Sequence, residues 1–487
     1  MGRFSRSMIA WWQRRSPNLL DLTLSQVAQI IDGTLIGKPN IRITGISTDS
    51  RTTKPGDLFC AILGERTDGH DHIIQAKANG AVAFLTSRDV SGDQVVAPTS
   101  SSELDPVISA LGRLATYIRN IMTAVEVIGV TGSSGKTSTK DMIGQVLSHA
   151  GPTHAPVGSP NNELGLPLTI LAAAPGIRYL VAEMGMRGLH HISSLCEIAH
   201  PTIGVVTNVG QAHIGEVGSI EAIAQAKSEL VQSLTDSGVA ILNADDSRVL
   251  AMRDLTKATV FTYGFSNQAD IRAENLELTT NGTYKFDLVY LGYRTSASIP
   301  ILGEHNVMNA LAAAAVGLAV GMELSQIVEA LASLQQVSKW RLEVHKLPGE
   351  ITIINDAYNA NPESMVAALD TLQNIPGSVK TWAVLGMMHE LGPQSVELHQ
   401  DVIAHGSRIG ISHLVAVGEN GQIYGLPNLT DKAQKAVWLP DFQAATDYIC
   451  SEVNSGDIVL FKASRSEQFE VLASDIQGRL RMKWSQE

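Results

Sequence analysis

A short apolar run that enters a glycine-rich turn constrains this chain more than any other feature. Residues 125–130 read Val-Glu-Val-Ile-Gly-Val, residues 131–135 read Thr-Gly-Ser-Ser-Gly, and a helical pattern follows at 141–147. A strand, a glycine-rich turn and a helix in this order form a phosphate-binding loop, because backbone N–H groups and the helix N-terminus then face an anion. The segment therefore predicts a nucleotide-binding domain of the α/β type.

The turn also predicts which side chains meet the nucleotide. Lys136 would lie against the β- and γ-phosphates, and the Thr137 hydroxyl would bind Mg²⁺. The strict motif has glycine at position 130, whereas this chain has Val130, so the match is to a shorter Gly-x-x-Gly-Lys-Thr core. A plain surface turn is the alternative, but the position between a strand and a helix favours nucleotide binding. The expected phosphate contacts are Thr131, Gly132, Ser133, Ser134, Gly135, Lys136, Thr137 and Ser138.

Composition narrows the class of protein. With 487 residues, the chain is too long for one hydrophobic core. A formal net charge of −12 argues against a general nucleic-acid binder, which needs a basic face, but leaves room for a local basic pocket. Cys60, Cys196 and Cys450 are far apart and show no metal-ligand spacing, which favours a reducing cytoplasm. No apolar run reaches about 18 residues, so we expect no stable membrane insertion.

The N-terminal part of the chain contains an extension and a first region. Residues 1–20 combine arginines with two tryptophans, and we expect a disordered extension, with a weak membrane-surface contact as the alternative. The first region, 21–105, opens with a capping-box helix start at Thr23 and Gln26. It continues as mixed α and β structure and ends in a polar linker at 97–105.

Two further regions each predict a parallel sheet. In the second region, 106–336, strand-like runs alternate with helical patterns, then come a hairpin-like stretch at 273–301 and a buried alanine-rich helix at 309–320. Its strand-like runs are 125–130, 179–182, 203–206 and 239–242. The third region, 337–487, has strands at 351–354, 382–385, 414–417 and 458–461. We therefore expect an α/β fold in three domains, with ligands at the carboxyl ends of the strands.

Polar residues stand where the central strands end. Glu183 closes the strand at 179–182, and His213 follows the strand at 203–206. Each alone would be an ordinary strand-end or loop residue, but beside a phosphate-binding loop in one sheet they predict a metal site. Lys227 lies in a helical segment, where a solvent-facing lysine is the alternative.

Taken together, these motifs resemble the Mur ligases, the ATP-dependent amide-forming enzymes of peptidoglycan precursor synthesis. The order is that of the family, and the similarity covers nearly the whole chain from about residue 21. Besides the phosphate-binding loop and Glu183, the matching segments are Asn208 with His213, Ala226-Lys227-Ser228-Glu229, Asn243-Ala244-Asp245-Asp246 and Gly303-x-His305-Asn306-x2-Asn309. The resemblance implies an N-terminal substrate domain, a central P-loop ATPase-like parallel sheet and a C-terminal Rossmann-like domain.

Within the family, the third region resembles the branch that acts last. That branch joins D-alanyl-D-alanine to UDP-N-acetylmuramoyl-tripeptide, and the run at 355–365, Asn-Asp-Ala-Tyr-Asn-Ala-Asn-Pro-Glu-Ser-Met, is similar to its sequence. Three positions depart from the usual pattern: Trp340 and Ala463 stand where glycine is common, and Met387 where aspartate is common. The departures leave the geometry of the acceptor site open.

The resemblance also implies a mechanism and a set of site residues. The γ-phosphate of ATP would move to a carboxylate, and an amine would then displace phosphate. Thr137 and Glu183 would hold one Mg²⁺, His213 would hold a second metal, and Lys227 would be carbamylated, which requires a neutral amine. An unmodified Lys227 on phosphate is the alternative. The implied nucleotide contacts are Asn243, Asn309, Arg341 and Asp356, and the implied substrate contacts are Ser50 and Arg51 for the uridine end, Asn161 and Asn162 for the peptide, and Arg465 for the dipeptide carboxylate.

Three rival functions remain at this level. The nearest is the Mur ligase that adds the third amino acid, lysine or diaminopimelate. A nucleotide-dependent switch would explain the loop but not the segment at Asn161 and Asn162. A catalytically inactive homologue is suggested by Met387 and Ala463. Intact Lys136, Glu183 and His213 argue against it. We expect a monomeric ligase.

Overall fold

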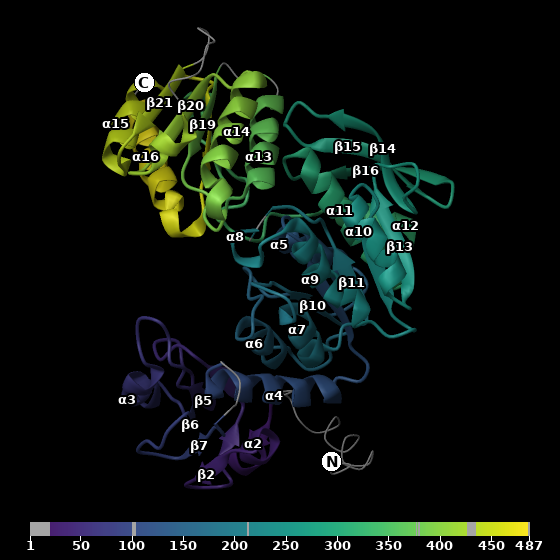
Figure 1. Cartoon of the computed structure of the whole chain (residues 1–487), viewed down its shortest axis with the longest axis vertical. Helices are drawn as coiled ribbons and strands as arrows, with labels where there is room; N and C mark the ends of the chain where they lie inside the picture. The colour runs from purple at the N-terminus through teal and green to yellow at the C-terminus, as the bar shows by residue number, and fades with distance from the viewer. Residues whose placement is uncertain are drawn as a thin grey trace.

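The computed structural model contains three α/β bodies arranged along the long axis of the molecule (Figure 1). It describes residues 20–99, 104–211, 214–375, 377, 380–425 and 435–485. Of the expected N-terminal extension only Leu20 falls within them. The α/β fold in three domains, predicted from the sequence, is confirmed. None of the described helices combines the length and apolar character needed to span a bilayer.

The N-terminal body is built on a five-stranded sheet in the order β2-β7-β6-β5-β4. Only β2 is antiparallel to its neighbour, and a separate antiparallel pair joins β1 to β3. The strands are β1 (Leu22–Thr23), β2 (Thr34–Ile36), β3 (Arg42–Ile43), β4 (Gly45–Ser47), β5 (Asp57–Cys60), β6 (Ala83–Thr86) and β7 (Gln94–Val96). The helices are α2 (Leu24–Ile31) and α3 (Ile73–Ala78). At the start of α2 the predicted capping box is confirmed, since Thr23 and Gln26 accept each other's backbone N–H.

A long helix joins this body to the next. Helix α4 (Pro106–Ile121) begins at Asp105, whose carboxylate accepts hydrogen bonds from the N–H groups of Val107 and Ile108. It packs against α2 on one side and against α6 (Gly165–Leu171) and α7 (His191–Ala199) on the other. One apolar core therefore runs from the N-terminal sheet into the central body. The expected linker at 97–105 lies partly outside the described residues.

The central body carries a nine-stranded sheet in the order β16-β15-β14-β13-β12-β11-β8-β10-β9. The strands from β9 to β14 are parallel, and β15 and β16 extend the sheet as antiparallel strands. Their bounds are β8 (Glu126–Thr131), β9 (Thr153–His154), β10 (Tyr179–Glu183), β11 (Ile203–Val206), β12 (Val239–Asn243), β13 (Thr259–Gly264), β14 (Ile271–Leu278), β15 (Tyr284–Tyr290) and β16 (Tyr293–Ile299). The βαβ rhythm predicted from the apolar runs is thus confirmed.

Helices cover both faces of this sheet. Helices α5 (Lys136–Ser148), α11 (Glu304–Ala319) and α12 (Leu324–Ala332) pack on one face, whereas α6, α7 and α9 (Ile220–Gln232) pack on the other. Two short helices, α8 (Ile214–Val217) and α10 (Ser247–Leu250), lie in connections. The predicted buried helix at 309–320 is α11, which begins earlier, at Glu304. The alanine run does not extend to the first turn of α11. The sequence pattern therefore predicted the buried middle of this helix and missed its start.

The C-terminal body has a six-stranded sheet in the order β17-β18-β22-β19-β20-β21. Only β17 is antiparallel to its neighbour. Helices α13 (Pro362–Asn374) and α14 (Ser395–Arg408) cover one face, and α15 (Phe442–Glu452) and α16 (Phe469–Trp484) cover the other. The strands are β17 (Glu343–Lys346), β18 (Thr352–Asn355), β19 (Thr381–Leu385), β20 (His413–Val417), β21 (Lys435–Leu439) and β22 (Ile458–Lys462).

The sequence prediction missed four strands of the central and C-terminal sheets. These are β9, β13, β17 and β21, and all of them except β13 lie at an edge of their sheet. Strand β17 alternates between half-buried and exposed residues, so it lacks the continuous apolar run of an inner parallel strand. Strand β21 does contain four consecutive apolar residues, at 436–439, but none of them is fully buried, and the prediction overlooked this run.

Candidate functional site

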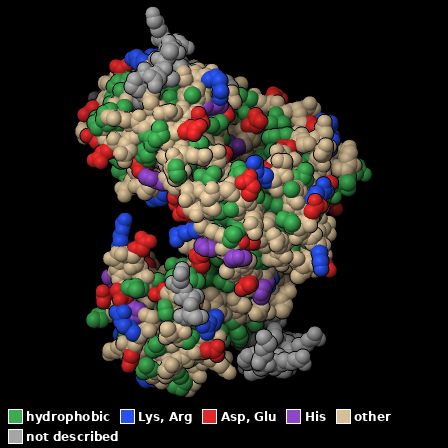
Figure 2. Space-filling view, viewed as in Figure 1, with side chains coloured by type: hydrophobic (Ala, Val, Ile, Leu, Met, Phe, Trp, Pro, Cys, Tyr) green, Lys and Arg blue, Asp and Glu red, His purple; other side chains and the backbone are tan. Residues whose placement is uncertain are grey.

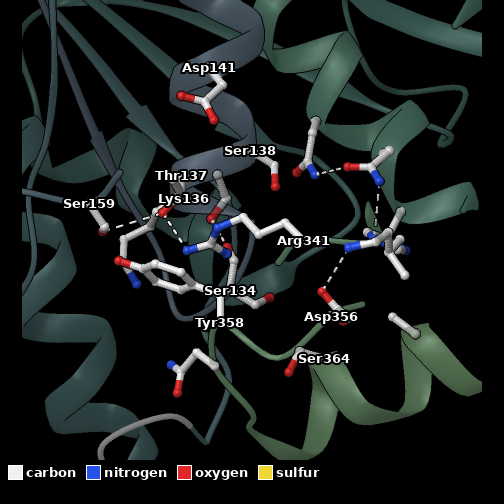
Figure 3. A pocket seen from close by; sticks show the side chains of 18 of the residues that line it. Ser134, Lys136, Thr137, Ser138, Asp141, Ser159, Arg341, Asp356, Tyr358 and Ser364 are labelled. Atoms are coloured by element: carbon white, nitrogen blue, oxygen red, sulfur yellow. Dashed lines mark hydrogen bonds between the residues drawn. The ribbon is translucent and has the colours of Figure 1, made fainter. Parts of the chain in front are cut away.

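A cavity of about 490 Å³ lies between the central and C-terminal bodies. Its walls come from the phosphate-binding loop and α5, from the end of β10, from α11, and from the strand ends of the C-terminal sheet. Figure 3 shows side chains of the two bodies converging there, with Arg341 and Asp356 opposite the loop residues Lys136 and Thr137. Both parallel sheets thus present carboxyl strand ends to one cavity, as expected for ligand sites in α/β folds.

The loop has the backbone shape that anion binding requires. Gly132 and Gly135 have φ angles of 155° and 75°, in the region that favours glycine. A Cβ at Gly132 would stand 1.8 Å from Thr207 Oγ1, so a larger residue would displace the neighbouring strand end. The N–H groups of Ser133 and Ser134 both point at one acceptor, Asn208 Oδ1, at 3.1 and 2.9 Å. A pair of convergent N–H groups at a helix N-terminus can equally donate to a phosphate oxygen.

Lys136 is folded back over this loop. Its ammonium donates to the Gly132 carbonyl at 2.7 Å. Burial lowers the pKa of Lys136, an effect that Arg341 reinforces and Glu183 opposes. A phosphate bound at the loop would favour the charged ammonium, because an opposite charge raises the pKa of an amine.

Hydroxyls and amides surround the buried carboxylate of Glu183. Glu183 is only 1% exposed. Thr137 Oγ1 donates to its Oε2 at 2.7 Å, and the Ser159 hydroxyl and the Asn161 amide donate to its Oε1 at 2.5 and 2.8 Å. Figure 3 shows Ser159 directed at Thr137, to which it is hydrogen-bonded. The sequence interpretation did not select Ser159, because a serine in an irregular connection carries no distinctive pattern.

These oxygens define where a hard cation could sit. Across the described residues, no three His, Cys, Asp or Glu side chains gather as a metal-binding group. A cation here would therefore take the Glu183 carboxylate and the hydroxyls of Thr137 and Ser159. That donor set suits Mg²⁺, which prefers oxygen and keeps several waters and phosphate oxygens as ligands. His213, the expected ligand of a second metal, lies outside the described residues.

Lys227 is buried rather than solvent-facing, so the alternative of a surface lysine is wrong. It lies on α9 and is 1% exposed. Burial, and then the positive charge of Lys136, hold its pKa well below the ordinary value of 10.5. Both effects favour the neutral amine, the form that reacts with CO₂.

The expected nucleotide contacts divide into two groups. Asn309 and Asp356 line the cavity, where Asn309 accepts a hydrogen bond from Thr139 Oγ1 at 3.1 Å. Asn243 does not line it: its amide donates to the Thr207 carbonyl at 2.8 Å, which supports the strand end behind the loop.

Arg341 connects the C-terminal body to the loop. Its Nη2 donates to Thr137 Oγ1 at 2.8 Å, and its guanidinium lies 4.1 Å from the ring centroid of Tyr358. Asp356 pairs with Lys462 at 2.6 Å, and both line the cavity. Tyr358 and Lys462 were not chosen as site residues from the sequence, because their importance depends on contacts between distant segments.

The expected acceptor residue Arg465 stands at the edge of the cavity. Its guanidinium lies 4.3 Å from the ring centroid of Trp340 and pairs with Glu470 at 2.5 Å. Trp340 has a φ angle of 59°, so the residue that stands where glycine is common keeps the backbone shape of glycine. Ala463 is fully buried and would lie 2.7 Å from a Cβ at Gly386. The structure thus accommodates tryptophan at 340 through a left-handed backbone and places Ala463 in the core.

Of the remaining expected substrate contacts, one lines the cavity and three lie outside it. Asn161 lines the cavity through its bond to Glu183, whereas Asn162 is exposed and accepts a hydrogen bond from the Gly165 N–H at 2.9 Å. Ser50 and Arg51 belong to the N-terminal body: Ser50 donates to Gln75 at 2.7 Å, and exposed Arg51 pairs with Asp49 at 2.7 Å. Figure 2 shows the surface hollowed between this body and the rest of the molecule.

A phosphate-binding loop beside a buried carboxylate, closed by a second α/β body, is the arrangement of an enzyme that uses a nucleotide triphosphate. Three family models match the chain: the Mur ligase family catalytic domain at residues 42–127, the Mur ligase middle domain at 130–317, and the Mur ligase glutamate ligase domain at 340–465. The chain belongs to the Mur ligase family, whose members are ATP-dependent amide ligases. The family and the enzyme class predicted from the sequence are therefore confirmed.

Relatives of full length give the same result. The UDP-N-acetylmuramoyl-tripeptide–D-alanyl-D-alanine ligase of Mycobacterium tuberculosis is 39% identical, over 92% of this chain and 96% of its own. The ligase of the same name from Bacillus subtilis is 34% identical, over 94% and 99%. Among solved structures, MurF from Acinetobacter baumannii has a TM-score of 0.84 at 32% identity, with 95% and 100% of the chains covered. MurF from Thermotoga maritima in complex with ADP has a TM-score of 0.77 at 27% identity, with 90% and 98% covered.

Proposed function

We propose that this chain joins D-alanyl-D-alanine to the terminal carboxylate of UDP-N-acetylmuramoyl-tripeptide, with ATP converted to ADP and phosphate. The observation that carries the proposal is similarity along nearly the whole chain to ligases of that name, at 39% identity over 92% of its residues. The cavity supports it, because loop, carboxylate and cationic side chains from two bodies line one space.

Two chemical steps would share the site. A carboxylate oxygen of the tripeptide attacks the γ-phosphorus, which forms an acyl phosphate and releases ADP. The amine of the dipeptide then attacks the acyl carbon, an amide bond forms, and phosphate leaves with the former carboxylate oxygen. Lys136 would hold the transferring phosphoryl group, and Arg341 would approach it from the C-terminal body. Closure of the two bodies would exclude water, which otherwise hydrolyses an acyl phosphate.

We propose Thr137, Ser159 and Glu183 as the protein ligands of Mg²⁺. When bound, the cation would neutralise charge between phosphate oxygens. His213 remains the proposed ligand of a second metal. Asn161, assigned to the peptide substrate from the sequence, also supports this site through Glu183.

The buried amine of Lys227 supports the proposal that it is carbamylated. Reaction of the neutral amine with CO₂ releases a proton and gives a carbamate anion, which places a negative charge in the neighbourhood of Lys136. A negative charge beside Lys136 favours its charged ammonium and is itself stabilised by that cation.

The remaining assignments are proposals of the same kind. Residues 21–105 would bind the UDP end through Ser50 and Arg51, and residues 337–487 would bind the dipeptide through Arg465. Residues 106–336 would bind ATP, with Asn243 and Asn309 as nucleotide contacts and with Asp356 of the C-terminal body as a further one. We further propose a monomer that works in the cytoplasm, where its nucleotide-linked substrate would be made.

A product assay tests the proposal. The protein is incubated with ATP, Mg²⁺, UDP-N-acetylmuramoyl-tripeptide and D-alanyl-D-alanine, and the product is identified by mass. The expected result is the pentapeptide, with continued turnover of ATP to ADP and phosphate only when both substrates are present. Ligation of lysine or diaminopimelate to the corresponding dipeptide substrate would instead support the enzyme for the third residue. ATP hydrolysis independent of both substrates would support a nucleotide-dependent switch.

A further inference from the structure

A buried lysine one turn beyond the phosphate-binding loop has no role in the chemistry above. Lys140 lies on α5, and its side chain is 0% exposed. Its ammonium donates to the backbone oxygens of Pro156 and Gly158, the latter at 2.9 Å, and pairs with Asp141 Oδ1 at 2.7 Å. An ammonium has three N–H donors, so these oxygens use its full capacity. Because burial of a cation is unfavourable unless it is paired and hydrogen-bonded, the surrounding backbone must be arranged around this amine.

The two carbonyls belong to the segment that carries Ser159, a neighbour of the Glu183 carboxylate. Residues 155–160, which follow β9, form no helix or strand, so their course depends on contacts such as those of Lys140. Ser159 comes immediately after Gly158, and its hydroxyl donates to Glu183 at 2.5 Å and accepts from Thr137 at 3.3 Å. The anchored carbonyl of Gly158 is therefore one residue away from a proposed cation ligand.

We propose that Lys140 is a positioning residue for the divalent cation. It holds the backbone at 156–158 against α5 and thereby keeps the Ser159 hydroxyl beside Thr137 and Glu183. Since α5 carries both Thr137 and Lys140, one rigid helix fixes the two hydroxyls relative to each other. The inference rests on the proposed function, which places the cation at this carboxylate.

A double-mutant cycle with Mn²⁺ as the probe distinguishes positioning from general stabilisation. Free Mn²⁺ is counted by electron paramagnetic resonance during titration of the whole chain and of Lys140→Met, Ser159→Ala and the double variant. Each single change is expected to weaken Mn²⁺ binding about tenfold, as for other groups that orient metal ligands. The double variant is expected to lose no more than either single variant, because Lys140 acts through Ser159. Lys285→Met, an exposed lysine on β15, is the control and should bind as the parent does.

Two results would overturn the inference. One is Lys140→Met with the Mn²⁺ affinity of the parent, and the other is a double variant whose loss is the product of the single losses, about a hundredfold. Thermal melting of each variant records stability separately. If Lys140→Met does not fold, Lys140→Arg takes its place, since it keeps the charge but its larger head group displaces the two carbonyls, and the same loss is expected.

Glu183→Gln separates this inference from the proposed function. If the parent and Glu183→Gln take up Mn²⁺ equally, the cation site itself is wrongly placed. If Glu183→Gln loses Mn²⁺ while the Lys140 variants keep the parent affinity, the cation site stands and only the role of Lys140 is refuted.

Discussion

The central and C-terminal bodies both place the carboxyl ends of their parallel strands at one cavity, but they contribute different chemical groups to it. The central sheet contributes a loop whose convergent backbone amides lie at a helix N-terminus, with one buried carboxylate next to it. The C-terminal sheet contributes paired side chains, such as Asp356 with Lys462. Phosphate recognition by backbone is thus local in sequence, whereas the C-terminal contribution depends on contacts between distant segments.

The largest effect is expected when the phosphate-binding loop of the central body loses the positive charge of Lys136. Lys136→Ala should lower turnover by about a thousandfold or more, because the transferring phosphoryl group loses its main cationic partner. Circular dichroism and thermal melting should show an intact fold, since the ammonium contacts the loop and not the core. Lys285→Ala, on the exposed surface of β15, is the matched control. Near-parental ligation by Lys136→Ala would show that the loop does not hold the phosphate.

The buried amine gives the next largest expected effect. Lys227→Ala should lose about a hundredfold or more in turnover, and short carboxylic acids such as acetate should restore part of it by replacing the carbamate. The same acids should not rescue Lys136→Ala, which controls for a general effect of salt. Full activity of Lys227→Ala without added acid would show that catalysis does not require a carbamate at this position.

Substitution of Arg341 tests the contribution of the C-terminal body, which depends on contacts between segments that are distant in sequence. Arg341→Ala should lower turnover about ten- to a hundredfold, because the C-terminal body loses its hydrogen bond to Thr137 and its stacking on Tyr358. Arg341→Lys should recover little, since an ammonium lacks the planar head that stacks and donates together. Steady-state kinetics with ATP as the varied substrate make the comparison. Parental rates in both variants would mean that the C-terminal body contributes no charge to the phosphoryl transfer.

The smallest effect is expected for a histidine at the amino ends of the strands of the C-terminal sheet, away from the cavity. His413 begins β20, stacks on Trp382 with ring centroids 3.6 Å apart, and has no hydrogen bond to either ring nitrogen within the described part of the chain. Burial, aided by Lys380 and Lys435, lowers its pKa to about 4. The unfolded chain therefore binds a proton between pH 6.5 and 4 that the folded chain does not, so stability falls as the pH falls through this window.

Denaturant titrations of the parent and His413→Phe at pH 7.5 and pH 4.5 check this expectation. The parent should lose about 1–2 kcal/mol more than the variant on acidification, after allowance for solvent screening. Ligase activity at pH 7.5 should be unchanged, because the cavity lies at the other ends of the strands. Equal acid sensitivity of the two proteins would show that His413 is not held neutral by burial.

The same contrast explains how much the sequence could reveal. The glycine-rich turn, the inner parallel strands and the carboxylate at the end of β10 are encoded in short segments, and the structure contains each of them. The edge strand β17 alternates between half-buried and exposed residues, so it lacks a continuous apolar run and was missed.

Ser159 and Lys140 were missed for another reason. Their roles arise from hydrogen bonds between residues that are 16 to 24 positions apart, and no spacing rule marks such pairs. The distinctive backbone at Trp340 was noted in the sequence only as a departure from the family, whereas its left-handed φ angle and its stacking under Arg465 are properties of the folded chain.

The central claim is that the γ-phosphate of ATP passes to the carboxylate of the peptide. Labelling the terminal carboxylate of UDP-N-acetylmuramoyl-tripeptide with ¹⁸O and analysing the released phosphate by mass spectrometry tests this claim most directly. The account predicts that each amide bond formed transfers one labelled oxygen from the carboxylate to inorganic phosphate. Ligation with entirely unlabelled phosphate would contradict it, because the carboxylate oxygen would then have left by another route.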